Sequence, residues 1–192
     1  MLRRTNLALV LVVIWTLVVS AGCLKGPQKA PRPQATPAKE GPVAVARSGR
    51  EPVLTLFDNK TGQKKDIKME DYIAGVVAAE MEPSWPVEAL AAQAMLARTF
   101  TLEALESKGG TQSLHGTDVS TKVEEFQAYD PSRINDNVRK AVQATRGKVL
   151  TYDGELIKAW FSAYAGPRTA TAKEGLNFKE PEPPYIKSVS NP

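Results

Sequence analysis

The pattern of apolar and polar positions divides the chain into three parts. Residues 7–22 are almost entirely apolar, and residues 24–50 are rich in Pro, Ala, Lys and Arg with few large apolar side chains. From Glu51 onward, short apolar runs alternate with polar turns, and about 140 residues is a usual size for one domain. The pattern therefore predicts an apolar N-terminal segment at 1–23, a linker at 24–50 and a folded domain at 51–192.

Two hairpins and a final strand are expected within the domain. Val53–Phe57 is a short apolar run that reads as a strand buried on both faces. A polar turn containing Gly follows it, and an Asp-Gly pair marks the second hairpin. The remaining expected strands are Lys65–Met69, Val149–Tyr152, Leu156–Phe161 and Tyr185–Val189.

Three helices are expected between the hairpins. Glu70–Met81 carries two acidic residues in its first turn, where negative charge suits the helix dipole. A second helix begins near Pro86 and runs to about Glu106; it is rich in Ala and poor in charge, so we expect it to be buried. A third helix covers Arg133–Thr145, and Thr111–Tyr129 reads as a long loop. The predicted fold is a single α+β domain whose long, buried, Ala-rich helix packs on short antiparallel strands.

The N-terminal segment has the features of an export signal. Arg3 and Arg4 precede the apolar run, and residues 20–23 are small residues ending in Cys23. Cys23 is then either the acylated first residue of a processed lipoprotein or part of an uncleaved membrane anchor; Ser20, where such lipoproteins usually carry Leu, departs from the processing pattern. Both alternatives place the domain on the extracytoplasmic face of the cell membrane.

Charge and cysteine content limit the classes of function. The first 50 residues hold eight basic residues and one acidic residue, which leaves 17 basic and 20 acidic residues in 51–192. The basic, proline-rich linker suits an extended spacer near anionic lipid or wall polymer, whereas the acidic domain has no nucleic-acid footprint. Because Cys23 is the only cysteine, the domain has neither a disulfide nor a thiol nucleophile.

Glu80 is the carboxylate that stands out from the pattern. It falls on the apolar stripe of its predicted helix, where a glutamate is disfavoured unless it is paired or used. It is either a proton donor for glycoside cleavage or a structural residue that pairs with a base such as Arg98 or lies exposed at the helix end. His115 is the only histidine, cannot form a two-histidine metal site, and reads as a surface-loop residue.

Two long runs resemble the core motif of the stage II sporulation protein D family. They are Asp71–Met81, with the sequence DYIAGVVAAEM, and Pro86–Thr99, with the sequence PVEALAAQAMLART. Weaker matches follow in the same order, at Gln127 and Tyr129, then at 141–150 and at Gly166. The resemblance covers about residues 53–189 and leaves out the N-terminal segment and the linker.

The resemblance implies a function in the bacterial cell wall. The family includes lytic transglycosylases that cut peptide-stripped glycan strands during sporulation, and amidase enhancers that modulate a separate wall amidase. In the transglycosylases the glutamate of the Ala-Glu-Met motif is the catalytic acid, and it corresponds to Glu80. The resemblance therefore implies peptidoglycan glycan strands and a cell-wall amidase as partners. The N-terminal segment adds the membrane through its anchor, and no cofactor is expected.

Other residues carry less defined expectations. Arg98 lies in the Ala-rich helix, where a buried arginine needs an acceptor; it either pairs with Glu80 or holds a carboxylate or acetamido oxygen of a sugar. Gln127 and Tyr129 either line a saccharide groove or, in the case of Tyr129, belong to the core. Glycan cleavage, non-enzymatic glycan binding with amidase enhancement, and a generic envelope lipoprotein are the three hypotheses.

Departures from the family pattern bear on the enzyme hypothesis. Many members carry a histidine and a cysteine at the positions that align with Phe161 and Tyr164, so we expect no metal site there. A paired glycine is partly retained at residues 165–167. Family members also usually continue beyond the position of Pro192, so we expect a domain that is short at its C-terminal end.

Overall fold

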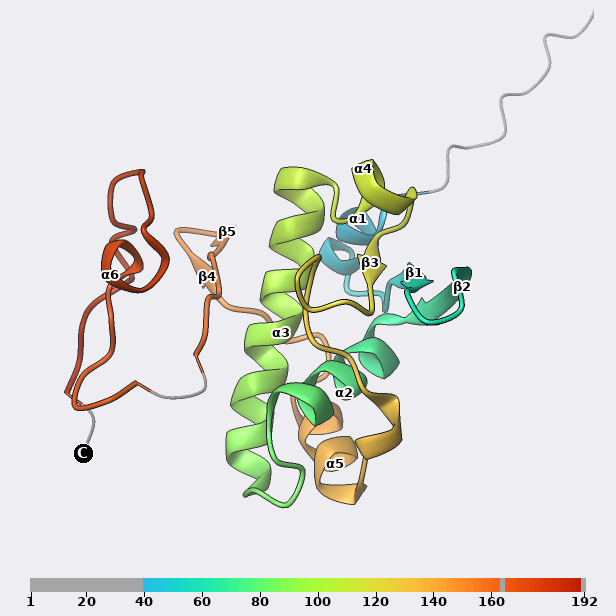
Figure 1. The fold of residues 1–192 in the computed structure, drawn as a ribbon, viewed down its shortest axis with the longest axis horizontal. Coiled ribbons are helices and arrows are strands. Elements are labelled where there is room, and N and C mark those ends of the chain that lie inside the picture. The colour runs from blue at the N-terminus through green and yellow to red at the C-terminus, as the bar shows by residue number, and fades with distance from the viewer. Residues whose placement is uncertain (1–39, 163–164, 191–192) are drawn as a thin grey trace, which may run out of the picture. The chain divides into compact units, whose positions relative to one another are not determined.

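The computed structural model describes residues 40–162 and 165–190, and these form part of one compact unit that clusters over residues 39–192 (Figure 1). The predicted signal or anchor at 1–23, its Cys23, and the linker as far as residue 39 lie outside the described residues. Within the described ranges, no helix has both the length and the apolar character required to cross a membrane.

A three-stranded sheet forms one side of the domain. Strands β1 (Val53–Asp58) and β2 (Gln63–Lys68) pair antiparallel, which confirms the first predicted hairpin. Strand β3 (Val119–Ser120) pairs parallel with β1, so the order is β2-β1-β3. It lies in the segment expected to be a loop. The prediction that β1 is buried on both faces is wrong, because Leu54 and Leu56 are fully buried whereas Val53 is 46% exposed.

The two long predicted helices are confirmed with small changes of boundary. Helix α2 (Met69–Glu80) has Glu70 and Asp71 in its first turn. Helix α3 (Val87–Lys108) follows Pro86 and ends at Gly109, which adopts the left-handed conformation (φ 69°) that favours glycine at a helix end.

The α3 helix packs chiefly on other helices, which differs from the expectation that it packs on strands. Helix α5 (Asp136–Ala144) and α2 lie against it, and its contact with the second hairpin is small. The predicted third helix is shorter than expected, because Asn135 caps α5 by accepting a hydrogen bond from the N–H of Val138. A short 3-10 helix, η1 (Pro131–Arg133), precedes this cap.

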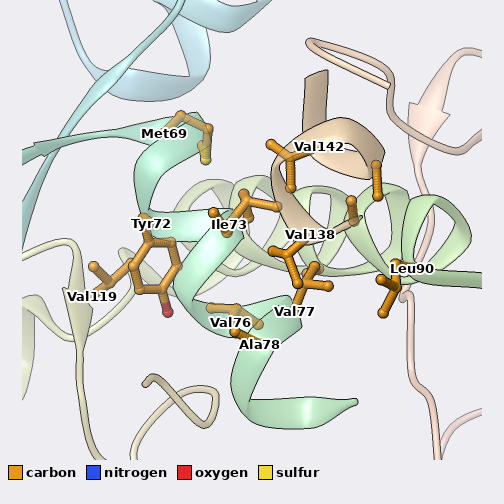
Figure 2. Close-up of a cluster of buried hydrophobic side chains, with 14 of the residues drawn as sticks. Met69, Tyr72, Ile73, Val76, Val77, Ala78, Leu90, Val119, Val138 and Val142 are labelled. Atoms are coloured by element: carbon orange, nitrogen blue, oxygen red, sulfur yellow. The ribbon is translucent and has the colours of Figure 1, made fainter. Parts of the chain in front are cut away.

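The hydrophobic core lies where α2, α3, α5 and the sheet meet (Figure 2). Full burial of each large aliphatic side chain contributes about 1.5–3 kcal/mol. Figure 2 shows Ile73 and Val77 of α2 on the side of Val138 of α5, whereas Tyr72 lies beside Val119 of β3. The fully buried members with the largest apolar side chains are Tyr72, Leu54, Leu56, Met69, Ile73, Leu90, Val76, Val77, Val119 and Val138.

Several short elements differ from the sequence-based expectations. Helix α1 (Pro42–Arg47) forms within the stretch expected to be an extended linker, because Pro42 stands at the start of the helix, where a missing N–H is tolerated. The second hairpin is confirmed but reduced to β4 (Thr151–Tyr152) and β5 (Glu155–Leu156). Helices α4 (Gln112–His115) and α6 (Ala172–Leu176) were not expected.

The final predicted strand, Tyr185–Val189, is wrong. This segment has no strand, and the residue that follows it, Ser190, forms an isolated antiparallel bridge with Arg168. Helix α6 lies between the two bridge residues in sequence, and a capping box at Thr171 and Glu174 starts it. Local capping thus accounts for α6, whereas the apolar residues of Tyr185–Val189 have no long partner strand among the described residues.

Candidate functional site

Glu80 is the last residue of α2 and is half-buried. Its Oε1 accepts a hydrogen bond from the backbone N–H of Ala128 at 3.0 Å. Within the described part of the chain, Oε2 accepts no hydrogen bond and no basic side chain lies within ion-pair distance of Glu80. The carboxyl group is therefore held by one oxygen and available at the other.

The segment 127–130 holds this arrangement together by contacts with α2 and α3. The Gln127 side chain donates from Nε2 to Oγ1 of Thr101 on α3 at 2.9 Å. The N–H of Asp130 donates to the carbonyl oxygen of Gly75 on α2 at 3.1 Å. Ala128, whose N–H binds Glu80, lies between these two attachments.

Tyr129 packs on Gly75 and Tyr72. Its ring and the ring of Tyr72 are stacked, with centroids 5.5 Å apart and planes 14° apart. A Cβ atom at Gly75 would lie 2.3 Å from Cε2 of Tyr129, which leaves no room for any side chain there. Burial raises the pKa of Tyr72 far above its ordinary value, and burial followed by the charge of Asp71 raises the pKa of Tyr129.

Gln127 is buried, being 3% exposed, so its side chain points into the protein. Its Oε1 and the hydroxyl of Tyr72 are both buried without a hydrogen-bond partner among the described residues. The structure therefore brings Gln127 and Tyr129 to the same region as Glu80, but the amide of Gln127 contacts α3 rather than an open surface.

Arg98, a residue of α3, lies beside the N-terminal end of α2, at the end opposite to Glu80. It is 1% exposed and forms a two-point ion pair with Glu70, with Nε–Oε1 and Nη2–Oε2 distances of 3.0 and 2.7 Å. Its Nη1 also donates to the carbonyl oxygen of Lys148 at 2.8 Å. The expected pairing with Glu80 is wrong, because ten helical residues separate Glu70 from Glu80 by about 15 Å. The partner is Glu70, at the start of the helix.

Two pockets lie near Glu70 and neither is lined by Glu80. The larger has a volume of about 530 Å³ and includes Arg98, Arg146 and apolar residues of α1 and β5 in its wall. The smaller, of about 340 Å³, lies between α2 and α5. Both cavities therefore lie at the N-terminal end of α2, next to Glu70, and not beside the predicted catalytic residue Glu80.

Trp85 is an exposed aromatic residue that the sequence analysis did not single out. It is 49% exposed in the turn that joins α2 to α3, five positions after Glu80. Asn135 fixes this turn by donating from Nδ2 to the carbonyl oxygen of Pro83 at 2.9 Å. The available sequence signal is a tryptophan in the short turn between Pro83 and Pro86.

The remaining candidates do not form a second site. Within residues 40–162 and 165–190, no group of three or more His, Cys, Asp or Glu residues is placed to hold a metal ion. Phe161 is exposed, and Tyr164 lies outside the described residues. His115 ends α4, and its ring stacks on that of Phe57 with the ring centroids 3.8 Å apart. Its Nε2 lies 2.7 Å from Oε2 of Glu125. It is a half-buried packing residue and not a loop residue.

Comparison with known proteins agrees with the motif. The family model described as Stage II sporulation protein matches residues 58–152. The stage II sporulation protein D of Bacillus amyloliquefaciens is 32% identical over 166 residues, which are 80% of this chain and 44% of that protein. The corresponding protein of Bacillus subtilis (strain 168) is 30% identical over 169 residues, 81% of this chain and 47% of its own length.

A third relative has a different name. The amidase enhancer of Bacillus subtilis (strain 168) is 40% identical over 102 residues, which are 53% of this chain and 13% of that protein. The chain thus spans less than half the length of each of these curated relatives. On the matched domain and on these identities, the chain belongs to the stage II sporulation protein D (SpoIID) family.

Proposed function

We propose that the chain is a lytic transglycosylase of peptidoglycan and that Glu80 is its catalytic acid and base. The observation that carries the proposal is the state of Glu80, with one oxygen held by the Ala128 N–H and the other without a partner among the described residues. Membership of the family supports a substrate in the cell wall.

The chemistry needs a single carboxyl group. Glu80 would protonate the oxygen that bridges N-acetylmuramic acid and N-acetylglucosamine, and the bond from this oxygen to the anomeric carbon would break. The resulting carboxylate would then take the proton of the muramic 6-hydroxyl as that oxygen bonds to the anomeric carbon. The product is a 1,6-anhydro sugar, Glu80 regains its proton, and no water is consumed. Two-carboxylate glycosidases need a second acid for a nucleophile or for water.

The other candidate residues take different parts in this proposal. Arg98 is buried and fully engaged with Glu70, so we assign it to the stability of the domain and not to sugar binding. The amide of Gln127 is likewise turned into the protein. Tyr129 is half-buried and remains a candidate for contact with the glycan, together with the exposed Trp85, whose flat apolar ring suits a sugar face.

We also propose that residues 1–23 export the chain and hold it at the extracytoplasmic face of the membrane. The support is the sequence pattern of Arg3, Arg4 and the apolar run before Cys23. Metabolic labelling with a fatty acid distinguishes the two forms of anchor. A lipoprotein loses the label when Cys23→Ala is introduced, whereas an uncleaved anchor is never labelled and stays in the membrane fraction.

Enhancement of a wall amidase is the second candidate function. It is favoured by the relative that is 40% identical and is named an amidase enhancer. In that case the region around Glu80 would bind glycan without cutting it, and the partner would be the amidase.

One experiment separates the two functions. The full chain, in wild-type and Glu80→Gln forms, is incubated with purified glycan, intact and stripped of peptides, with and without a purified wall amidase. A transglycosylase releases anhydro-ended fragments without the amidase, and Glu80→Gln does not. If the wild type releases none but increases the rate of the amidase, the enhancer function replaces our proposal.

A further inference from the structure

The ring of Tyr129 packs tightly on Gly75, and Tyr129 directly follows Ala128, whose N–H binds Glu80. We propose that Tyr129, seated on Gly75, is a positioning residue that fixes the Ala128 N–H on Oε1 of Glu80. This inference rests on the proposed function, because it explains how the catalytic carboxyl group is oriented.

The peptide that binds Glu80 is held from both sides. Gln127, immediately before Ala128, is attached to Thr101 of α3 by its side chain. Tyr129, immediately after it, is stacked on Tyr72, and the next residue binds the carbonyl oxygen of Gly75. With both neighbours fixed, the direction of the Ala128 N–H is set by the fit of the ring on the helix.

Glycine at position 75 has a spatial reason and not a conformational one. Gly75 lies inside α2 with ordinary helical backbone, and glycine is unfavourable in a helix interior. A Cβ atom there would lie 2.3, 2.7 and 3.1 Å from three atoms of the Tyr129 ring. Any larger residue would therefore push the ring, and with it the segment 127–130, away from α2.

The orientation of Glu80 follows from this fit. The hydrogen bond to Oε1 restricts the orientation of the carboxyl group and leaves Oε2 without a hydrogen-bond partner among the described residues. A shift of the segment by about 1 Å is enough to lose such alignment, and misplacement of this size can lower a rate by up to about 100-fold. Tyr129 therefore acts through Ala128, without a need to touch the substrate.

The test combines catalysis with a direct observation of the hydrogen bond. In an NMR titration of the wild type, the Ala128 amide resonance should move with pH as Glu80 gains its proton, and this movement should vanish in Glu80→Gln. We expect Gly75→Ala to abolish the same movement and to lower kcat by about 10- to 100-fold, with KM changed much less. Gly175→Ala in α6 is the control, because an added Cβ there lies no closer than 3.4 Å to its neighbour.

Two further variants guard against misfolding. Tyr129→Phe keeps the ring and should keep the pH response of the Ala128 amide; loss of that response would show that the hydroxyl, and not the ring, is needed. Tyr129→Ala should lose the response and lower kcat, and adding Gly75→Ala to it should lower kcat no further, because the clash acts through the ring. A further loss in the double variant, or an unchanged response in Gly75→Ala, would overturn the inference.

The result is distinguishable from failure of the proposed function. If Glu80→Gln leaves glycan cleavage unchanged, the assignment of Glu80 is wrong whatever the amide resonance shows. If Glu80→Gln abolishes cleavage but the wild-type Ala128 amide does not respond to pH, the enzyme function stands and the positioning inference is refuted.

Discussion

Replacement of Glu70 by Gln tests whether Arg98 is a structural residue. The change removes the charge of Glu70 and leaves the guanidinium group of Arg98, which is 1% exposed, with the carbonyl oxygen of Lys148 as its remaining strong acceptor. Removal of one partner of a buried ion pair costs about 3–5 kcal/mol. Since domains of this size have a free energy of unfolding of about 5–15 kcal/mol, a large share of the stability should be lost.

The expected change is measurable by urea and thermal unfolding followed by circular dichroism. A domain of about 150 residues loses about 2–4 °C in melting temperature per kcal/mol, so Glu70→Gln should lower it by about 6–20 °C. The slope of the unfolding free energy against urea should stay constant. Glu82→Gln is the matched control, because its ion pair with Arg133 is exposed and contributes about 0–1 kcal/mol.

A double replacement compares the buried ion pair with an apolar pair at the same two positions. Glu70→Leu with Arg98→Met removes both charges and keeps apolar volume, so it should recover much of the stability lost in Glu70→Gln. A loss below about 1 kcal/mol in Glu70→Gln would contradict the structural role. A loss of glycan affinity without a loss of stability would return Arg98 to the sugar-binding residues.

Two further predictions concern the titration of the carboxyl groups of Glu174 and Glu125. Hydrogen bonds from Arg168 lower the pKa of Glu174 to about 2. The stability that ionised Glu174 contributes to the fold is therefore present above the ordinary pKa of a glutamate and is lost as the pH falls toward 2. Arg168→Ala should raise the NMR titration midpoint of Glu174, and an unchanged midpoint would refute the contact. The hydroxyl of Ser120, followed by His115, lowers the pKa of Glu125. Ser120→Ala should raise the titration midpoint of Glu125, so that residues 121–126 lose order at a higher pH as acid is added. Amide hydrogen exchange in residues 121–126 measures this, and identical pH profiles for wild type and variant would count against it.

The helices around the site were predictable because their signals are local. Acidic residues in the first turn mark the start of α2, Pro86 precedes α3, and Gly109 ends it. The motif residue Glu80 was also found from sequence. These signals act within a few residues, so no knowledge of the rest of the fold is needed.

The remaining features depend on distant contacts. The two-residue strand β3 exists because Asp118, next to it, binds the backbone N–H and the hydroxyl of Thr55 in β1. Glu70 is the partner of Arg98 although 28 positions separate them. The fit of Tyr129 on Gly75 joins positions 54 residues apart in the chain, so neither periodicity nor composition reveals it.

Cleavage of glycan by Glu80 without water can be detected by isotope labelling. The full chain, wild type and Glu80→Gln, is incubated with peptide-stripped glycan in water enriched in oxygen-18, and the new ends are analysed by mass spectrometry. We expect unlabelled 1,6-anhydromuramic ends from the wild type and none from a folded Glu80→Gln protein. Labelled reducing ends, or equal cleavage by both proteins, would contradict it.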